Sequence, residues 1–275
     1  MTSQARAGCR GYIAAGIVCA SAVAGIAGCG GSSHSPLTPV TVTGNWEFSA
    51  AATSSGTTSF PVYLLSNGAD VWGTVVLPPE PALICVAGCC GGPLSGMDPS
   101  LTGTIDGNGN LKLSSTSSSN SQVFTMSGMV SGANMSNGSF ALTGACGTQG
   151  TITGTEYPAI NGTYSGTVAS QNLGQNFTVT MVLNQSNSPN SYGFLGLTGT
   201  LSVSGYSCLT STALQVNTSF VGNTFGGELN ITSKEGFGYA GTLSADGKTI
   251  AFTYGLSGAS GSCNDDYGKG TLTLQ

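Results

Sequence analysis

Few side chains in this sequence could carry out catalysis, and only one of them is a histidine. His34 lies in a segment rich in Gly, Ser and Pro, which cannot bury enough apolar surface to fold. A folded site therefore has no imidazole to act as a base, and this excludes Ser-His-Asp and Cys-His mechanisms and His-containing metal centres. We predict that the chain is not an enzyme and that it carries no cofactor or metal ion.

Carboxylates are the remaining candidates for acid and base chemistry. A glycosidase needs only two of them, held about 5 to 9.5 Å apart across a cleft. Glu47, Asp70 and Glu228 fall on expected strands or strand ends, but nothing in the sequence brings two of them together. Solvated surface carboxylates are the simpler interpretation, and a carbohydrate-acting enzyme is kept as an alternative.

Two segments carry oxygen ligands that calcium would accept. Residues 106–110 (Asp-Gly-Asn-Gly-Asn) resemble the start of an EF-hand loop, but glycine is absent from the sixth position and no helices flank it. Residues 264–266 (Asn-Asp-Asp) are the other segment. A hairpin turn accounts for residues 106–110 without any metal ion.

From Val42 onward the sequence is typical of β-strands joined by tight turns. Residues 177–183 and 271–274 alternate apolar and polar side chains, as half-buried strands do. Residues 106–110 and 245–248 contain Asp-Gly or Asn-Gly, which supply the positive φ of hairpin turns. The rhythm of about 10 to 12 residues predicts antiparallel meanders closed into barrels or sandwiches.

An internal duplication divides this β-rich part into two units. Residues 42–46 (Val-Thr-Gly-Asn-Trp) align with residues 160–164 (Ile-Asn-Gly-Thr-Tyr), and residues 124–130 align with 237–243. The later matches pair residues 139–144 with 250–255, Cys146 with Cys263, and residues 151–154 with 271–274. The alignment predicts a first β unit over residues 42–157 and a second over residues 160–275.

Each unit has about eight candidate strands, the number that closes an up-and-down barrel around side chains or one small ligand. We therefore predict an all-β fold of two duplicated antiparallel meanders, each an up-and-down barrel. The simplest role for Trp46 and Tyr164, which occupy matching positions near the start of the two units, is to plug the barrel ends.

The opening Gly44-Asn45-Trp46 resembles the Gly-x-Trp that begins the first strand of lipocalins. The resemblance implies a barrel that holds a small apolar ligand. Lipocalins also pack an arginine on that tryptophan, a residue that both units lack. The candidates for lining such an interior are Trp46, Phe60, Phe177 and Phe225.

The first 28 residues have the layout of a secretory signal peptide. Arg6 and Arg10 precede a small, apolar run over residues 11–27. A transmembrane helix would need about 20 apolar residues, and this run is shorter and contains Gly, Ser and Cys.

The run ends on Ile26-Ala27-Gly28-Cys29, which resembles the lipobox of bacterial lipoproteins. The resemblance implies that Cys29 becomes the lipidated N-terminus and anchors the protein in a membrane. Residues 29–41 then form a Gly/Ser/Pro tether. Gly30 stands where an aspartate would favour the inner membrane, so the resemblance implies the outer membrane.

The chain after residue 28 is acidic and weakly charged. It has four lysines and no arginine against 11 acidic residues, a net charge of −7. Charged residues make up only 6% of the sequence, against about 25% in typical soluble domains. Nucleic acids and anionic lipid headgroups are bound by clustered Lys and Arg, so we predict neither as a partner.

Six cysteines remain after the expected cleavage and lipidation, and an even number in an exported chain predicts disulfides. Cys208 and Cys263 are the only two in the second unit, and we predict that they pair. Cys146 takes the place of Cys263 in the first unit. Its candidate partners are Cys85, Cys89 and Cys90, of which the other two could bridge within their loop. A zinc site is the alternative for these four, although the usual Cys-x₂-Cys spacing and a nearby histidine are missing.

These observations favour a lipid-anchored protein of the cell envelope with a non-enzymatic binding or structural role, with another envelope protein as a candidate partner. The alternative is a carrier of a small apolar ligand, which would need a barrel interior that its own side chains leave unfilled. A membrane-spanning barrel ranks lowest, because its strands would need about 9 to 11 residues and an apolar outer band.

Overall fold

The computed structural model describes most of both predicted β units. The described residues are 40–53, 57–75, 100–116, 123–143, 147–190, 194–209, 213–231, 235–259 and 261–275. The expected signal peptide, Cys29 and His34 lie outside them. No helix within these ranges is long and apolar enough to cross a membrane.

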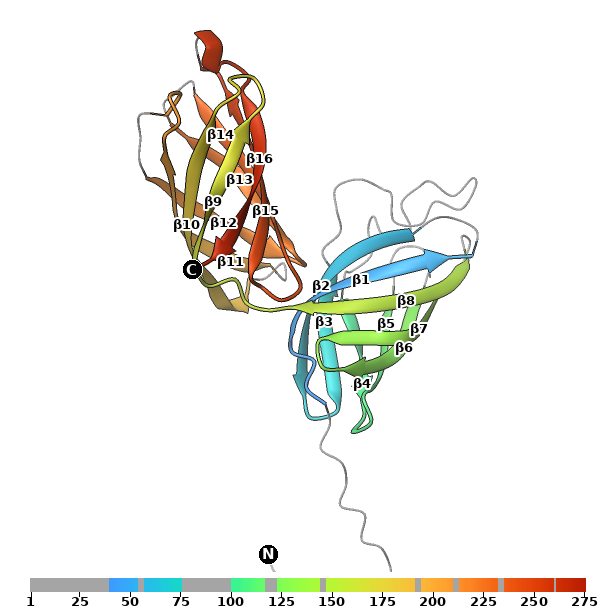
Figure 1. Ribbon diagram of the computed structural model, residues 1–275. Helices are drawn as coiled ribbons and strands as arrows, with labels where there is room; N and C mark the ends of the chain where they lie inside the picture. Colours follow the sequence, from blue (N-terminus) through green and yellow to red (C-terminus); the bar gives the residue numbers. More distant parts are fainter. Residues whose placement is uncertain are drawn as a thin grey trace, which may run out of the picture. The chain divides into compact units, whose positions relative to one another are not determined.

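The described part is all-β and forms two closed eight-stranded antiparallel barrels in succession, which confirms the predicted fold (Figure 1). In each barrel the strands follow one another in sequence order, and the last strand pairs with the first. The first barrel consists of β1 (Gly44–Ala52), β2 (Thr57–Asn67), β3 (Asp70–Val75), β4 (Ser100–Ile105), β5 (Asn110–Thr116), β6 (Val123–Ser131), β7 (Asn134–Thr143) and β8 (Thr148–Tyr157).

The second barrel repeats this order from β9 to β16. Its strands are β9 (Gly162–Ser170), β10 (Asn176–Pro189), β11 (Leu195–Ser204), β12 (Leu214–Val221), β13 (Thr224–Asn230), β14 (Gly236–Leu243), β15 (Thr249–Ser257) and β16 (Tyr267–Leu274), with the short 3₁₀ helix η1 (Gly261–Cys263) before the last strand.

Strand β10 shows why these segments fold as strands. Phe177, Val179, Met181 and Leu183 are buried, whereas the residues between them are less buried and face outward. This alternation lets one face of the strand join the core while the other meets water. The predicted hairpin turns are also present, between β4 and β5 and between β14 and β15.

Two hydrogen bonds join the residues just before β1 to the end of β2. The Val42 amide donates to Ser66 Oγ (3.3 Å), and the Ser66 amide donates to Thr43 Oγ1 (2.9 Å). Val42 is fully buried. These two hydrogen bonds fix the position at which the chain enters β1.

The second barrel has an equivalent pair of hydrogen bonds at the matching positions. The Ile160 amide donates to Gln185 Oε1 (3.0 Å), and the Gln185 amide donates to Asn161 Oδ1 (2.9 Å). Ile160, like its counterpart Val42, is fully buried. The predicted duplication therefore extends from the sequence to individual hydrogen bonds.

Trp46 and Tyr164 fill the same place in the two barrels. Trp46 is fully buried and its Nε1 donates to the Val42 carbonyl (3.0 Å). Tyr164 is buried to the same degree, and its hydroxyl donates to the Gly247 carbonyl (2.9 Å) in the turn between β14 and β15. Each ring thus plugs its barrel with its polar atom satisfied.

Tyr164→Phe should destabilise the protein by about 1 kcal/mol, because it leaves the Gly247 carbonyl without its buried donor. Urea unfolding followed by near-ultraviolet circular dichroism of the tyrosines measures this change. Tyr267→Phe is the matched control, because Tyr267 is 56% exposed. Equal effects of the two substitutions would contradict the role of the Tyr164 hydroxyl.

Candidate functional site

A chain of packed aromatic rings lies in the core of the first barrel. Trp46 stacks on Phe48 with ring centroids 5.9 Å apart, and Phe48 stacks on Phe60 at 5.8 Å. Phe60 meets Phe124 edge to face at 6.1 Å, and Phe124 stacks on Phe140 at 6.1 Å. The lining candidates Trp46 and Phe60 therefore point into the barrel, where they pack against its own rings.

The interior of the second barrel is similarly aromatic. Phe177 stacks on Tyr206 at 4.4 Å and meets Tyr254 edge to face at 5.2 Å. Phe225 lies 6.5 Å from Phe220, again centroid to centroid. Phe177 and Phe225 are at most 5% exposed, so the other two lining candidates also belong to a packed core.

The candidate catalytic carboxylates are dispersed over the barrels. Glu47 on β1 lies opposite Pro61 of β2, and Asp70 on β3 lies opposite Asn67 of β2. Six residues of one strand span about 20 Å, well beyond the separation that paired carboxylates need. Glu228 belongs to β13 of the second barrel. The two first-barrel candidates thus do not share a cleft.

Asp106 serves the β4–β5 turn. Its carboxylate accepts hydrogen bonds from the amides of Asn108 (2.8 Å) and Asn110 (2.9 Å) and from the Asn110 side chain (2.8 Å). The side-chain hydrogen bond from Asn110 leads the causes that lower the pKa of Asp106. The carboxylate is thus engaged by its own turn, as a hairpin interpretation requires. Within the described ranges, no three His, Cys, Asp or Glu side chains are grouped to hold a metal ion.

The second barrel contains the predicted Cys208–Cys263 disulfide, with Cα atoms 5.6 Å apart. It joins the connection between β11 and β12 to η1. The remaining cysteines of the sequence analysis lie outside the described residues, and their roles stay predictions. They are Cys29, Cys85, Cys89, Cys90 and Cys146.

A polar cluster that the sequence did not predict lies beside this disulfide. Asp266 is fully buried, and its carboxylate accepts hydrogen bonds from the Tyr206 and Tyr254 hydroxyls, each at 2.5 Å. The Ser170 hydroxyl (2.8 Å) and the Asn172 amide (3.2 Å) also donate to it. We call these five residues the Asp266 cluster.

The donors of this cluster determine its ionisation. Burial alone would raise the pKa of Asp266, but the hydrogen bonds from Tyr206, Tyr254, Ser170 and Asn172 outweigh it and lower the pKa. Burial, aided by the hydrogen bond to Asp266, raises the pKa of Tyr254 to about 12. A buried carboxylate that accepts four hydrogen bonds remains ionised and has a structural role.

The outer wall of the first barrel carries two parallel rows of mainly small polar side chains. The rows follow from the cross-strand register, which sets each member opposite the next on strands β3 to β8. The first row is Asp70, Thr104, Lys112, Ser127, Ser139 and Thr151. The second row is Trp72, Thr102, Ser114, Thr125, Ala141 and Gln149.

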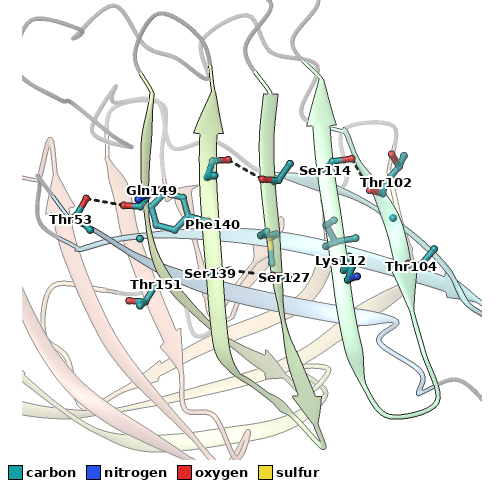
Figure 2. Close-up of a pocket in the computed structure, with 16 residues that line it drawn as sticks. Thr53, Thr102, Thr104, Lys112, Ser114, Ser127, Ser139, Phe140, Gln149 and Thr151 are labelled. Atoms are coloured by element: carbon teal, nitrogen blue, oxygen red, sulfur yellow. Dashed lines mark hydrogen bonds between the residues drawn. The ribbon is translucent and has the colours of Figure 1, made fainter.

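The members of these rows on β4 to β8 line an open depression of about 800 Å³, in which the polar side chains of adjacent strands face outward together (Figure 2). Asp70 and Trp72 lie beside it on β3. The hydroxyls of Ser127 and Ser139 lie 3.3 Å apart, and Thr125 Oγ1 donates to the Ala141 carbonyl (3.3 Å). A second depression of about 720 Å³ continues toward the β4–β5 turn. Thr104, Lys112 and Ser127 line both depressions, and we call the two together the outer groove.

Alternation of apolar and polar residues predicts that these side chains face outward, but it does not predict a groove. The groove requires the register between the five strands β4 to β8, which no single strand encodes. Trp72 is 41% exposed, and its place opposite Thr102, one of the lining residues, is likewise a product of register.

No protein-family model matches this chain, and the curated proteins contain no significant match to its sequence.

Proposed function

We propose that this chain is an exported, lipid-anchored protein of the cell envelope that binds its partner through an outer wall of its barrels and performs no reaction. The observation that carries the proposal is the packed apolar core of each barrel. Buried aliphatic and aromatic side chains cluster in both interiors, where a lipocalin-like ligand would bind, whereas the outer groove is open to solvent.

Support for the anchor comes from the N-terminal sequence. The signal-like segment ends on the lipobox-like Ile26-Ala27-Gly28-Cys29. The tether that follows would leave the barrels free to reach a partner beside the membrane. Several acyl chains together hold a protein firmly, whereas a single chain binds only marginally.

Cys29→Ala should abolish incorporation of a fatty-acid analogue and leave the precursor uncleaved, because the lipid is attached to that sulfur. Labelling in the producing bacterium followed by detergent partitioning measures both effects. Cys19→Ala is the matched control, since Cys19 lies within the segment expected to be removed. Unchanged labelling of the Cys29 variant would refute the anchor.

Surface binding is tested by native mass spectrometry of the mature protein released from detergent. The expected mass is that of the acylated chain with no small apolar adduct. A stoichiometric apolar adduct would instead support the carrier alternative and overturn the proposal that binding takes place on the outside.

A further inference from the structure

The hydrogen-bonding groups of the outer groove match those of a hydroxylated ligand. Thr and Ser hydroxyls both donate and accept, and Thr104, Ser127, Ser139 and Thr151 present them in one row. The neighbouring strands repeat about every 4.8 Å. A ligand that carries hydroxyls along its length can therefore form the same exchangeable hydrogen bonds at successive strands.

The charges of the groove indicate an uncharged ligand. Lys112 is the only basic residue in residues 42–157, and it forms no ion pair within the described part. Asp70 and Asp106 lie nearer the β4–β5 turn. One cation and two anions do not attract a polyanion, which is bound by clustered bases. Lys112 as a donor and Asp70, beside the first row, as an acceptor suit neutral hydroxyl groups.

An exposed tryptophan lies at the β3 side of the groove. Trp72 is 41% exposed, whereas Trp46 is completely buried. Trp72 lies opposite Thr102 and thus shares the outward face of the lining residues. An indole ring offers an apolar face with negative quadrupole, on which the C–H face of a sugar ring can stack while its hydroxyls reach the polar rows.

We propose that the outer groove binds an uncharged, hydroxyl-rich polysaccharide, with one sugar stacked on Trp72 and the chain lying along the rows of Thr and Ser. This inference rests on the proposed function of binding through the outer wall and gives that wall a ligand class. Two adjoining open depressions fit a segment of a polymer, whereas a buried pocket would suit a free small sugar.

The proposal is tested by affinity electrophoresis of the mature protein in gels containing dextran, soluble starch or galactomannan, with alginate as the acidic comparison. We expect retardation by at least one neutral polysaccharide and none by alginate. Trp72→Ala should weaken that binding at least tenfold, and Trp72→Tyr should retain most of it. Tyr267→Ala removes an aromatic residue of the second barrel that is more exposed than Trp72 (56% against 41%) and should leave binding unchanged.

A second pair of variants blocks the groove without touching Trp72. Ser139→Arg places a long side chain in the middle of the first row and should weaken binding to the same extent. Thr253→Arg is its matched control, because Thr253 is an exposed residue that precedes Tyr254 on β15 as Ser139 precedes Phe140 on β7. Unchanged unfolding midpoints for all variants confirm that the fold is intact.

Several outcomes would overturn the proposal. They are the absence of binding to any neutral polysaccharide, binding to alginate alone, and wild-type binding by both Trp72→Ala and Ser139→Arg. The proposed function fails by different measurements, namely loss of the acyl label or the presence of an apolar adduct. If the protein is lipidated, carries no apolar adduct and binds no polysaccharide, only the proposed ligand class is refuted.

Discussion

Asp266→Asn is expected to lower the free energy of unfolding by about 3 kcal/mol at neutral pH. The Tyr206 and Tyr254 hydroxyls donate to one carboxylate oxygen, and the Ser170 hydroxyl and the Asn172 amide donate to the other, so the NH₂ group of an asparagine must face one of these two pairs of donors. An unsatisfied buried polar group costs about 1 to 3 kcal/mol, and more where a charge-assisted bond is lost. Urea unfolding followed through the tyrosine circular dichroism measures the effect.

The same substitution should remove part of the pH dependence of stability. The pKa of Asp266 is lowered in the folded state, so its contribution is fully present above its unfolded pKa of about 3.9. That contribution is lost as the pH falls through this value toward the lower folded pKa. The wild type should therefore lose stability between about pH 5 and 2 more steeply than Asp266→Asn.

Asp265→Asn is the control for both measurements. Asp265 is exposed and has a φ of +56°, a conformation that asparagine also tolerates. Its effect should stay within about 0.5 kcal/mol. If the two asparagine variants were equally stable, the Asp266 cluster would not have the structural role that its hydrogen bonds indicate.

Removal of the Cys208–Cys263 disulfide is the other change with a large expected effect. The bridge closes 55 residues of chain, for which the chain-entropy relation predicts about 4 kcal/mol of stabilisation. The double variant Cys208→Ala/Cys263→Ala should unfold at correspondingly lower urea under oxidising conditions. Reductant should then bring the tyrosine-reported transition of the wild type down toward that of the variant. A loss below about 1 kcal/mol would contradict the prediction.

The disulfide and the Asp266 cluster should also interact. Cys208 follows Tyr206 by two residues, and Cys263 precedes Asp266 by three. Without the bridge, the segments that bring Tyr206 to Asp266 are held less firmly. The combined variant should therefore lose less stability than the sum of the two separate losses, as expected for neighbouring groups that share a function.

Local patterns predicted the fold because an up-and-down barrel needs little else. Alternating strands, Asp-Gly turns and about eight strands per unit already specify a meander that closes on itself. The match between Trp46 and Tyr164 likewise needed only the repeated motif, and both rings are buried at equivalent positions. These features depend on neighbours in the sequence.

The Asp266 cluster was not predictable by the same reasoning. Its donors come from residues 12, 60 and 96 positions away, and sequence alone could not place three separate segments around one carboxylate. From the sequence alone, residues 264–266 indicate only oxygen ligands that calcium would accept. The outer groove escaped prediction for a related reason, because its shape and its neighbour Trp72 depend on cross-strand register.

The duplicated barrels have diverged at this cluster. Trp46 pairs with Glu156 and the equivalent Tyr164 pairs with Leu274, and Thr148 and Asp266 each lie eight residues before these partners. Thr148 therefore takes the position of Asp266, and its hydroxyl has no hydrogen-bond partner in the described part of the chain. One barrel thus closes with an ionic cluster and the other with an uncharged side chain.

The positions of the two tryptophans give the molecule a built-in optical asymmetry. Both belong to the first barrel, Trp46 within its core and Trp72 on its outer wall. Indole emission therefore reports on that barrel alone, with one shielded fluorophore and one that water and dissolved quenchers can reach. A polymer covering the outer groove would protect the second from quenching and leave the first unchanged, so unmodified protein can reveal which surface is occupied.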